Sequence, residues 1–203
     1  MCIRDRAGFE VPVTPATRQV PFALGRTHAD PATLQRFAGA VRRRLAAADP
    51  AWFGYGDPRG SDELRRALAA HLAATRGLRC DPGCILITSG TQQGLRLCAE
   101  ALLQPNDAVW FEDPGYPAAR RLFEAVGART VAVPVDAAGL MVEAGRRLAP
   151  RARLAYVTPS HQFPTGVAMS MERRVALLDW AREADAWLLE DDYDSEFRYA
   201  GPP

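Results

Sequence analysis

The sequence predicts an α/β fold in which helices cover both faces of a mostly parallel sheet. Two observations lead to this prediction. Short apolar runs alternate with amphipathic segments from residue 22 onwards, and several of these runs end abruptly in polar loops rich in glycine and proline. Because open α/β sheets bind ligands at the carboxyl ends of their strands, the residues that follow each predicted strand are the candidates for a functional site.

The composition indicates a folded protein and excludes several classes of function. Of the 203 residues, 48% are hydrophobic, and a net charge of +1 gives no electrostatic signal for nucleic-acid binding. No apolar run reaches membrane-spanning length and no signal peptide is recognisable, so we expect a cytoplasmic protein. We expect no metal site, and we interpret the four cysteines as reduced core thiols: Cys2, Cys80, Cys84 and Cys98.

The chain contains no lysine, and all 25 of its basic residues are arginine. A coding bias would explain this composition. Whatever its origin, it leaves no side-chain amine that could form a Schiff base with a carbonyl compound.

The amino-terminal segment is predicted to stand apart from the domain. Residues 1–6 show no periodicity and resemble a cloning or translation scar, and residues up to 21 form a linker or arm rich in proline and threonine. The domain itself is expected to cover residues 22–203.

Capping residues and apolar periodicity place the helices. Asp30 and Pro31 begin a helix that ends near residue 48, and Ser61 caps a second helix that Gly77 ends. Further helices are expected at 91–103, 118–125 and 170–184. The following side chains are expected to face inward: Leu64, Leu68 and Leu72 in the second helix, and Val175, Leu178 and Trp180 or Ala181 in the last.

Five buried strands are predicted between these helices, at residues 84–88, 107–111, 130–133, 153–157 and 187–189. The last begins at Trp187 and has the continuous apolar character of a strand buried on both faces. Strands and helices therefore alternate along the chain, as in a parallel sheet.

Four of the predicted strands are followed by side chains that suit a flat, phosphorylated ligand. Residues 89–93 join a strand to a helix start, where free N–H groups bind phosphate, and Tyr116 lies in a rigid turn suited to stacking. His161 follows the next strand, and Asp191 and Tyr193 follow the last. Each segment alone also fits a simpler interpretation, such as helix capping, a surface turn or a solvated acidic loop, but their convergence at one sheet edge favours a site.

Five motifs in this order resemble the class I/II aminotransferases, which bind pyridoxal 5'-phosphate. The wording of the loops is most similar to the aminotransferase-like domain of MocR regulators, a subfamily of the GntR-type transcription regulators. The motifs are residues 55–60 (YGDPRG), 88–93 (TSGTQQ), 112–117 (EDPGYP), 158–166 (TPSHQFPTG) and 190–198 (EDDYDSEFR).

The resemblance implies a role for each candidate residue. Asp191 would pair with the pyridinium nitrogen of the cofactor, Tyr193 would bond its phenolic oxygen, and Tyr116 would stack on its ring. Tyr55 would reach the phosphate held by a partner subunit, because sites of this family lie at a dimer interface. The phosphate itself would be held by the residues after the first predicted strand: Ser89, Gly90, Thr91 and Gln92.

The sequence departs from the family pattern in ways that limit what it can do. Phe163 stands where aminotransferases carry an asparagine that contacts the phenolic oxygen, and either His161 or Gln162 would have to replace it. The resemblance places the Schiff-base lysine, and the arginine that grips the substrate carboxylate, beyond Pro203. We therefore interpret the chain as the middle of a larger protein, and as inactive in transamination by itself.

Three functions remain open at this point. The first is the effector-sensing domain of a MocR-type regulator, a homodimer that responds to an amino acid or amine and binds DNA through a winged-helix domain outside this chain. The second is a piece of a working amino-acid aminotransferase. The third is a non-catalytic phosphate-binding module. A helix-turn-helix pattern upstream in the reading frame would select the first, and a lysine downstream would exclude the third.

Overall fold

The computed structural model describes residues 30–195 and divides into two units at the bond between Tyr55 and Gly56. The expected scar and arm, residues 1–21, lie outside the described residues. In the first unit, helix α1 (Pro31–Ala46) precedes a short 3-10 helix, η1 (Pro50–Phe53). Helix α1 begins as predicted, because Asp30 Oδ1 accepts a 2.8 Å hydrogen bond from the backbone N–H of Thr33.

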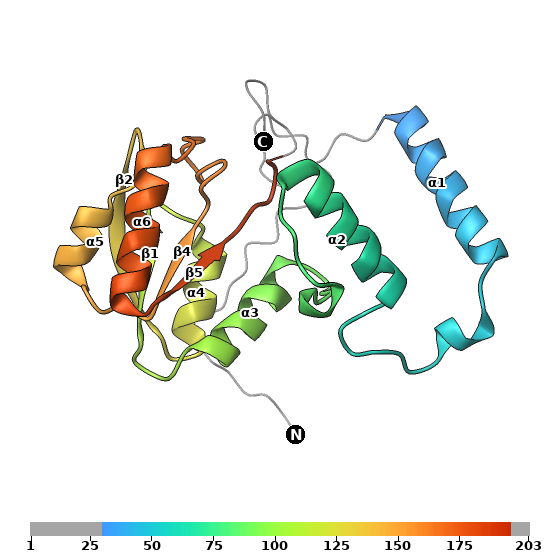
Figure 1. The fold of residues 1–203 in the computed structure, drawn as a ribbon, viewed down its shortest axis with the longest axis horizontal. Helices are drawn as coiled ribbons and strands as arrows, with labels where there is room; N and C mark the ends of the chain where they lie inside the picture. The colour runs from blue at the N-terminus through green and yellow to red at the C-terminus, as the bar shows by residue number, and fades with distance from the viewer. Residues whose placement is uncertain (1–29, 196–203) are drawn as a thin grey trace, which may run out of the picture. The chain divides into compact units, whose positions relative to one another are not determined.

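The second unit is built on a five-stranded sheet, which confirms the predicted fold class (Figure 1). The strand order is β3-β2-β1-β4-β5, and only β3 runs antiparallel to its neighbour. The strands are β1 (Ala108–Asp113), β2 (Arg129–Asp136), β3 (Gly139–Leu140), β4 (Leu154–Val157) and β5 (Trp187–Glu190).

Two apolar cores lie on opposite faces of this sheet. Helices α3 (Thr91–Leu102) and α4 (Pro117–Ala125) cover the face that carries Phe111 and Tyr156. Helices α5 (Val142–Leu148) and α6 (Met171–Ala184) cover the other face, where Trp110 stacks on Trp180 with ring centroids 3.5 Å apart. Because side chains alternate along a strand, β1, β4 and β5 each supply both cores, whereas β2 and β3 supply only the core under α5 and α6.

The predicted buried strand at residues 84–88 is not formed. Cys84 ends a 3-10 helix, η2 (Pro82–Cys84), and Ile85 is extended, but the backbone N–H of Ile87 donates to Arg59 O in a loop, at 2.9 Å. A strand needs a neighbour, and no strand among the described residues pairs with this segment. Leu86 is consequently 47% exposed.

Several side chains expected in the core are exposed. Trp187 is half-exposed because β5 is an edge strand of the described sheet, and the thiol-bearing Cys84 is exposed rather than part of the core. In α6 the buried residues are Leu177, Trp180 and Ala181, of which the last two were predicted. The apolar residues of this helix are spread around its circumference and do not form a single stripe. The following residues expected to face inward are exposed: Leu64, Val175 and Leu178.

The sequence did not predict β3 and α5, which lie between residues 134 and 152. A turn joins β2 to β3, in which Asp136 Oδ1 accepts a 2.8 Å hydrogen bond from the N–H of Ala138. Gly139 follows with φ at +100°, where a Cβ atom would lie 2.9 Å from Met169. The aspartate and glycine around two alanines are a turn signal that would have located this hairpin.

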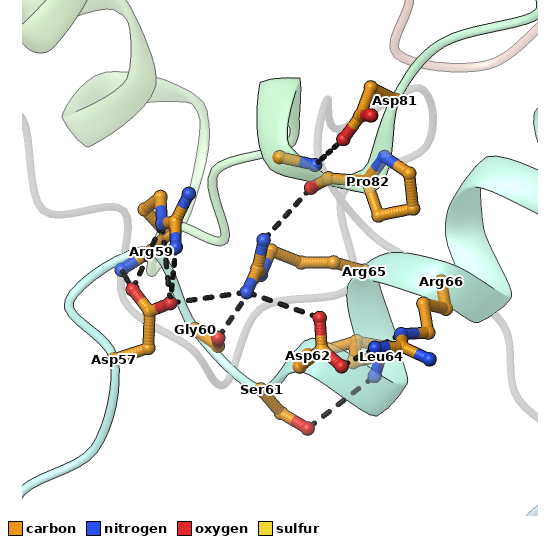
Figure 2. A network of polar contacts seen from close by, with 11 residues as sticks. Asp57, Arg59, Gly60, Ser61, Asp62, Leu64, Arg65, Arg66, Asp81 and Pro82 are labelled. Atoms are coloured by element: carbon orange, nitrogen blue, oxygen red, sulfur yellow. Dashed lines mark hydrogen bonds and ion pairs between the residues drawn. The ribbon is translucent and has the colours of Figure 1, made fainter.

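Helix α2 (Asp62–Arg76) is fixed to the loops on either side of it by a buried arginine, Arg65 (Figure 2). The guanidinium donates to Gly60 O at 3.3 Å, to Pro82 O at 3.0 Å and to Asp57 Oδ2 at 3.1 Å. Hydrogen bonds from Arg59 lower the pKa of the Asp57 carboxyl to about 2, so this partner stays charged. Residues 57–60 of the first motif are thereby tied to η2.

Replacing Arg65 should destabilise the chain far more than replacing its neighbour. Arg65→Met removes a buried cation, leaves Gly60 O without this donor and takes one of several donors from Pro82 O and Asp57, so the free energy of unfolding should fall by about 3 kcal/mol. Arg66 is 72% exposed and bonds only Asp62 among the described residues, so Arg66→Met should change it by less than about 1 kcal/mol. Urea unfolding of the two variants measures the difference, and equal effects would contradict the role given to Arg65.

A buried carboxylate, Glu112, joins the end of β1 to the loop after β4. Its Oε2 atom accepts hydrogen bonds from the Thr158 hydroxyl at 2.6 Å, the Thr158 N–H at 3.3 Å and Gln162 Nε2 at 3.2 Å. Its Oε1 atom is buried and has no partner among the described residues. Burial raises the pKa of Glu112 above its ordinary value of 4.5, although the hydrogen bonds oppose this effect.

The contribution of Glu112 to the free energy of unfolding should therefore decrease as the pH rises. The folded chain keeps the Glu112 proton at pH values where the unfolded chain has lost it, so the free energy of unfolding should fall as the pH rises above about 4.5. Glu112→Gln removes this contribution, and the stability of the variant relative to the wild type should increase between about pH 5 and about pH 8.

Glu124 provides a control of opposite sign. Its hydrogen bond from the Thr130 hydroxyl lowers the pKa of the Glu124 carboxyl, so it stabilises the fold above the ordinary pKa and loses this effect on acidification. The stability of Glu124→Gln relative to the wild type should hence decrease as the pH rises towards the ordinary pKa of 4.5 and stay level above it. Urea unfolding from about pH 3 to about pH 8 distinguishes the two pH windows, and a difference for Glu112→Gln that stays flat above about pH 5 would refute the raised pKa of Glu112.

Candidate functional site

A glycine-dependent turn precedes α3 at residues 89 and 90. Gly90 has φ at +151° and ψ at 174°, a conformation that is essentially restricted to glycine, and a Cβ atom added there would meet nothing within 4 Å. Two hydrogen bonds within the segment hold this turn: the Ser89 N–H and the Ser89 hydroxyl donate to Gln93 Oε1 at 2.6 Å and 2.8 Å. Within the described chain no side chain caps this helix start, so the first N–H groups of α3, at Thr91 and Gln92, have no hydrogen-bond partner among the described residues.

Tyr116 lies just after the end of β1, as the sequence predicted. The preceding Gly115 is required there, because a Cβ atom would approach Glu112 O to 2.3 Å. The half-buried Tyr116 ring meets Phe163 edge-on at 5.7 Å, and Gln92 Nε2 donates to its hydroxyl at 3.5 Å. The aromatic ring thus connects the α3 start with the loop after β4.

Asp191 is the first residue after β5. Its N–H donates to Val157 O at 2.9 Å, and its Oδ2 atom accepts a 2.6 Å hydrogen bond from the hydroxyl of Tyr156. Leu189 pairs with Tyr156 in the sheet, and alternation places Asp191 on the same face as both. This is the face covered by α3 and α4, so Asp191 shares it with the α3 start and Tyr116.

His161 and Tyr193 lie together, and Asp194 joins them. The two rings stack with centroids 6.2 Å apart, and the Tyr193 hydroxyl donates to His161 O at 2.9 Å. His161 Nδ1 lies 2.6 Å from Asp194 Oδ2. The other carboxylate oxygen of Asp194, Oδ1, is buried and has no partner in the described chain. Burial, followed by the charges of Asp194 and Asp191, raises the pKa of Tyr193, which keeps its hydroxyl protonated.

The side chains of Gln162 and His161 are engaged very differently. Gln162 is 2% exposed, and its amide bonds Glu112, the Pro114 carbonyl and the Phe163 carbonyl. Its Oε1 atom accepts hydrogen bonds from Thr165. Every polar atom of Gln162 is therefore used inside the protein, whereas the His161 ring is exposed.

Sequence reasoning missed three contributors to this site: Tyr156, Glu112 and Arg76. Arg76, the last residue of α2, bonds Asp192 and Ser195 and so connects that helix to the segment after β5. Burial by itself would raise the pKa of Asp192, but hydrogen bonds from Arg76 and Ser195 outweigh it and lower the pKa. Tyr156 could have been found from the sequence, because alternation along the two strands places it on the same sheet face as Asp191. The contact of Arg76 with Asp192 joins residues far apart in the chain, so no sequence pattern indicates it.

Tyr55 is the one candidate that belongs to the first unit. It ends that unit, and its side chain is fully exposed there. Its expected contact with a phosphate held by a partner subunit stays a prediction.

Comparisons with known proteins agree with the five motifs. Residues 20–201 match the family aminotransferase class I and II. The chain is 36% identical over 201 residues to the probable rhizopine catabolism regulatory protein MocR of Rhizobium meliloti, covering 99% of this chain and 38% of that protein. It is 41% identical over 177 residues to the pyridoxine biosynthesis transcriptional regulator PdxR of Corynebacterium glutamicum, covering 86% and 37%.

Solved structures show the same fold. An archaeal alanine:glyoxylate aminotransferase superposes with a TM-score of 0.76 at 34% identity, over 82% of this chain and 43% of that one. The kynurenine aminotransferase of Pyrococcus horikoshii gives 0.73 at 32% identity, over 84% and 43%. The chain spans less than half the length of each of these relatives.

The match over residues 20–201, the parallel sheet and the regulator relatives lead to one conclusion. The chain belongs to the aminotransferase class I and II family, as an aminotransferase-like segment related to the MocR-type regulators.

Proposed function

We propose that the chain is the pyridoxal-phosphate-binding part of an effector-sensing domain in a MocR-type transcription regulator. Members of this family typically depend on pyridoxal phosphate. The observation that carries the proposal is the placement of the Gly90 turn and Asp191 on one sheet face, with Tyr116 on the same side. The complete protein would be a cytoplasmic homodimer that binds DNA through a winged-helix domain outside this chain.

The side chains present fit the three parts of this cofactor. The uncapped start of α3 offers N–H groups and the positive end of the helix dipole to a phosphate, with Ser89, Thr91 and Gln92 beside it. Tyr116 offers an aromatic face to a flat ring. Asp191 offers a carboxylate to a protonated ring nitrogen, which would strengthen the electron sink that the cofactor supplies when bound.

The phenolic oxygen of the ring would lie among His161, Tyr193 and Gln162. Gln162 is bonded throughout, and the Tyr193 hydroxyl already donates its proton to His161 O, so a contact of Tyr193 with the ring would replace that bond. The exposed His161 ring is the group that we assign to the place of the family asparagine. Tyr55 from a partner subunit would complete the phosphate site.

A working aminotransferase is the second candidate, because the solved relatives at 34% and 32% identity are named as enzymes. The reading frame on either side of the chain separates the two. A helix-turn-helix segment upstream would support the regulator, and its absence from the complete gene would favour the enzyme.

The first test is the affinity of the chain for pyridoxal phosphate, measured by equilibrium dialysis. Binding should be saturable, and Asp191→Asn should weaken it roughly 10- to 100-fold, because a hydrogen bond to a charged group contributes about 1.5–3 kcal/mol. Asp179→Asn, which changes a half-exposed aspartate of α6 on the other side of the sheet, should leave the affinity unchanged. Equal affinities for the wild type and Asp191→Asn would refute the role of Asp191.

A second test concerns the absent amine. After incubation with pyridoxal phosphate and reduction with borohydride, no internal residue of the chain should carry the cofactor, because arginine stays protonated and is not a nucleophile near neutral pH. An added amino acid should not be converted to its keto acid. Mass spectrometry of the digested chain, together with a keto-acid assay, checks both points, and turnover would contradict the proposal that catalysis needs a group outside this chain.

A further inference from the structure

Tyr156 lies in the core of the second unit but ends in a polar contact with the candidate site. Its side chain is 0% exposed, and its ring stacks on Phe111 at 5.0 Å with an angle of 8° between the planes. Phe123 of α4 meets the same ring at 5.9 Å. The hydroxyl emerges from this aromatic packing and donates to Asp191 Oδ2 at 2.6 Å.

The sheet fixes both ends of this hydrogen bond. Tyr156 sits in β4 between Phe111 of β1 and Leu189 of β5, so its backbone is paired on both sides. Asp191 is held to the same strand by the hydrogen bond from its N–H to Val157 O. The two side chains therefore face each other because of strand register, not because of a movable loop.

The direction of the bond is also determined. Burial raises the pKa of Tyr156 far above its ordinary value, and the neighbouring Asp191 carboxylate raises it further, so the phenol stays protonated and donates. Within residues 30–195, no other side chain donates to Asp191. One carboxylate oxygen is thus occupied, and the other is left to accept from a ligand.

We propose that Tyr156 is a positioning residue that orients the Asp191 carboxylate toward the ring nitrogen of the cofactor. The proposal rests on the proposed function. Without the Tyr156 hydroxyl, the Asp191 carboxylate would be free to rotate about its terminal torsion. Its second oxygen would then spend less time within hydrogen-bond reach of the ring nitrogen. Tyr156 itself touches neither the cofactor nor the reacting atoms in this assignment.

The test compares two probes: pyridoxal phosphate, and its analogue in which a CH group replaces the ring nitrogen. Asp191 can accept a hydrogen bond only from the first, so the ratio of the two affinities reports the contact with the ring nitrogen. Tyr156→Phe keeps the aromatic packing and should reduce this preference about tenfold, with little change in the affinity for the analogue. Tyr156→Phe/Asp191→Asn should resemble Asp191→Asn, because residues that act through one contact are not additive.

A purely structural role of Tyr156 predicts a different pattern. Phe123→Leu loosens the same aromatic packing and keeps the hydroxyl, so it should affect both probes alike and leave their ratio unchanged. An unchanged ratio in Tyr156→Phe, together with a lower ratio in Asp191→Asn, would overturn the proposal and leave the proposed function intact. If the wild-type chain binds neither probe, the proposed function fails and this proposal fails with it.

A further variant covers the case in which Tyr156→Phe does not fold. Asp191→Glu keeps the carboxylate but moves it by one methylene group away from the position that the Tyr156 hydroxyl fixes. It should lose most of the preference for the ring nitrogen. A preference equal to that of the wild type would mean that the exact placement by Tyr156 is unnecessary, and would refute the proposal.

Discussion

The candidate site depends on the pairing of β4 between β1 and β5. This pairing aligns Phe111, Tyr156 and Leu189 across three strands, and it sets which side chains at the strand ends point to the α3 and α4 face. A slip of one residue would turn Asp191 to the opposite face, where α5 and α6 lie. The apolar packing of Phe111, Phe123 and Tyr156 resists such a slip, so the core that stabilises the sheet also specifies the site.

Much of the fold followed from local signals, whereas its edges did not. The caps at Asp30, Ser61 and Ser170, and the four parallel strands β1, β2, β4 and β5, have signatures that act within a few residues. Leu86 and Trp187 stand in runs of the same apolar character but are about half exposed, because burial depends on neighbours that lie far away in the sequence or outside the described residues. Periodicity reports what a segment prefers and not whether a partner is present.

The site divides in a similar way. Tyr116 and Asp191 were predictable because each follows a strand, and strand ends meet at one edge of a parallel sheet. Gly90 was predictable from the small residues before the α3 start, although the strand expected in front of it is not formed. Apart from Tyr156, the groups that hold them were not predictable. Glu112 and Gln162 bond each other across 50 residues, and Arg76 reaches Asp192 across 116, so neither contact leaves a periodic or local pattern. For this reason the sequence left open whether Gln162 or His161 replaces the family asparagine. Because the polar atoms of Gln162 are all hydrogen-bonded inside the protein, His161 is favoured for that place.

The position of β5 at the margin of the described sheet has a consequence for what can pair with this strand. One side of β5 pairs with β4, and within the described residues no strand pairs with its other side, next to the half-exposed Trp187. Unpaired backbone groups beside an apolar side chain form a template for another strand. A further strand, from outside the described residues or from a second copy of the chain, would pair at this edge.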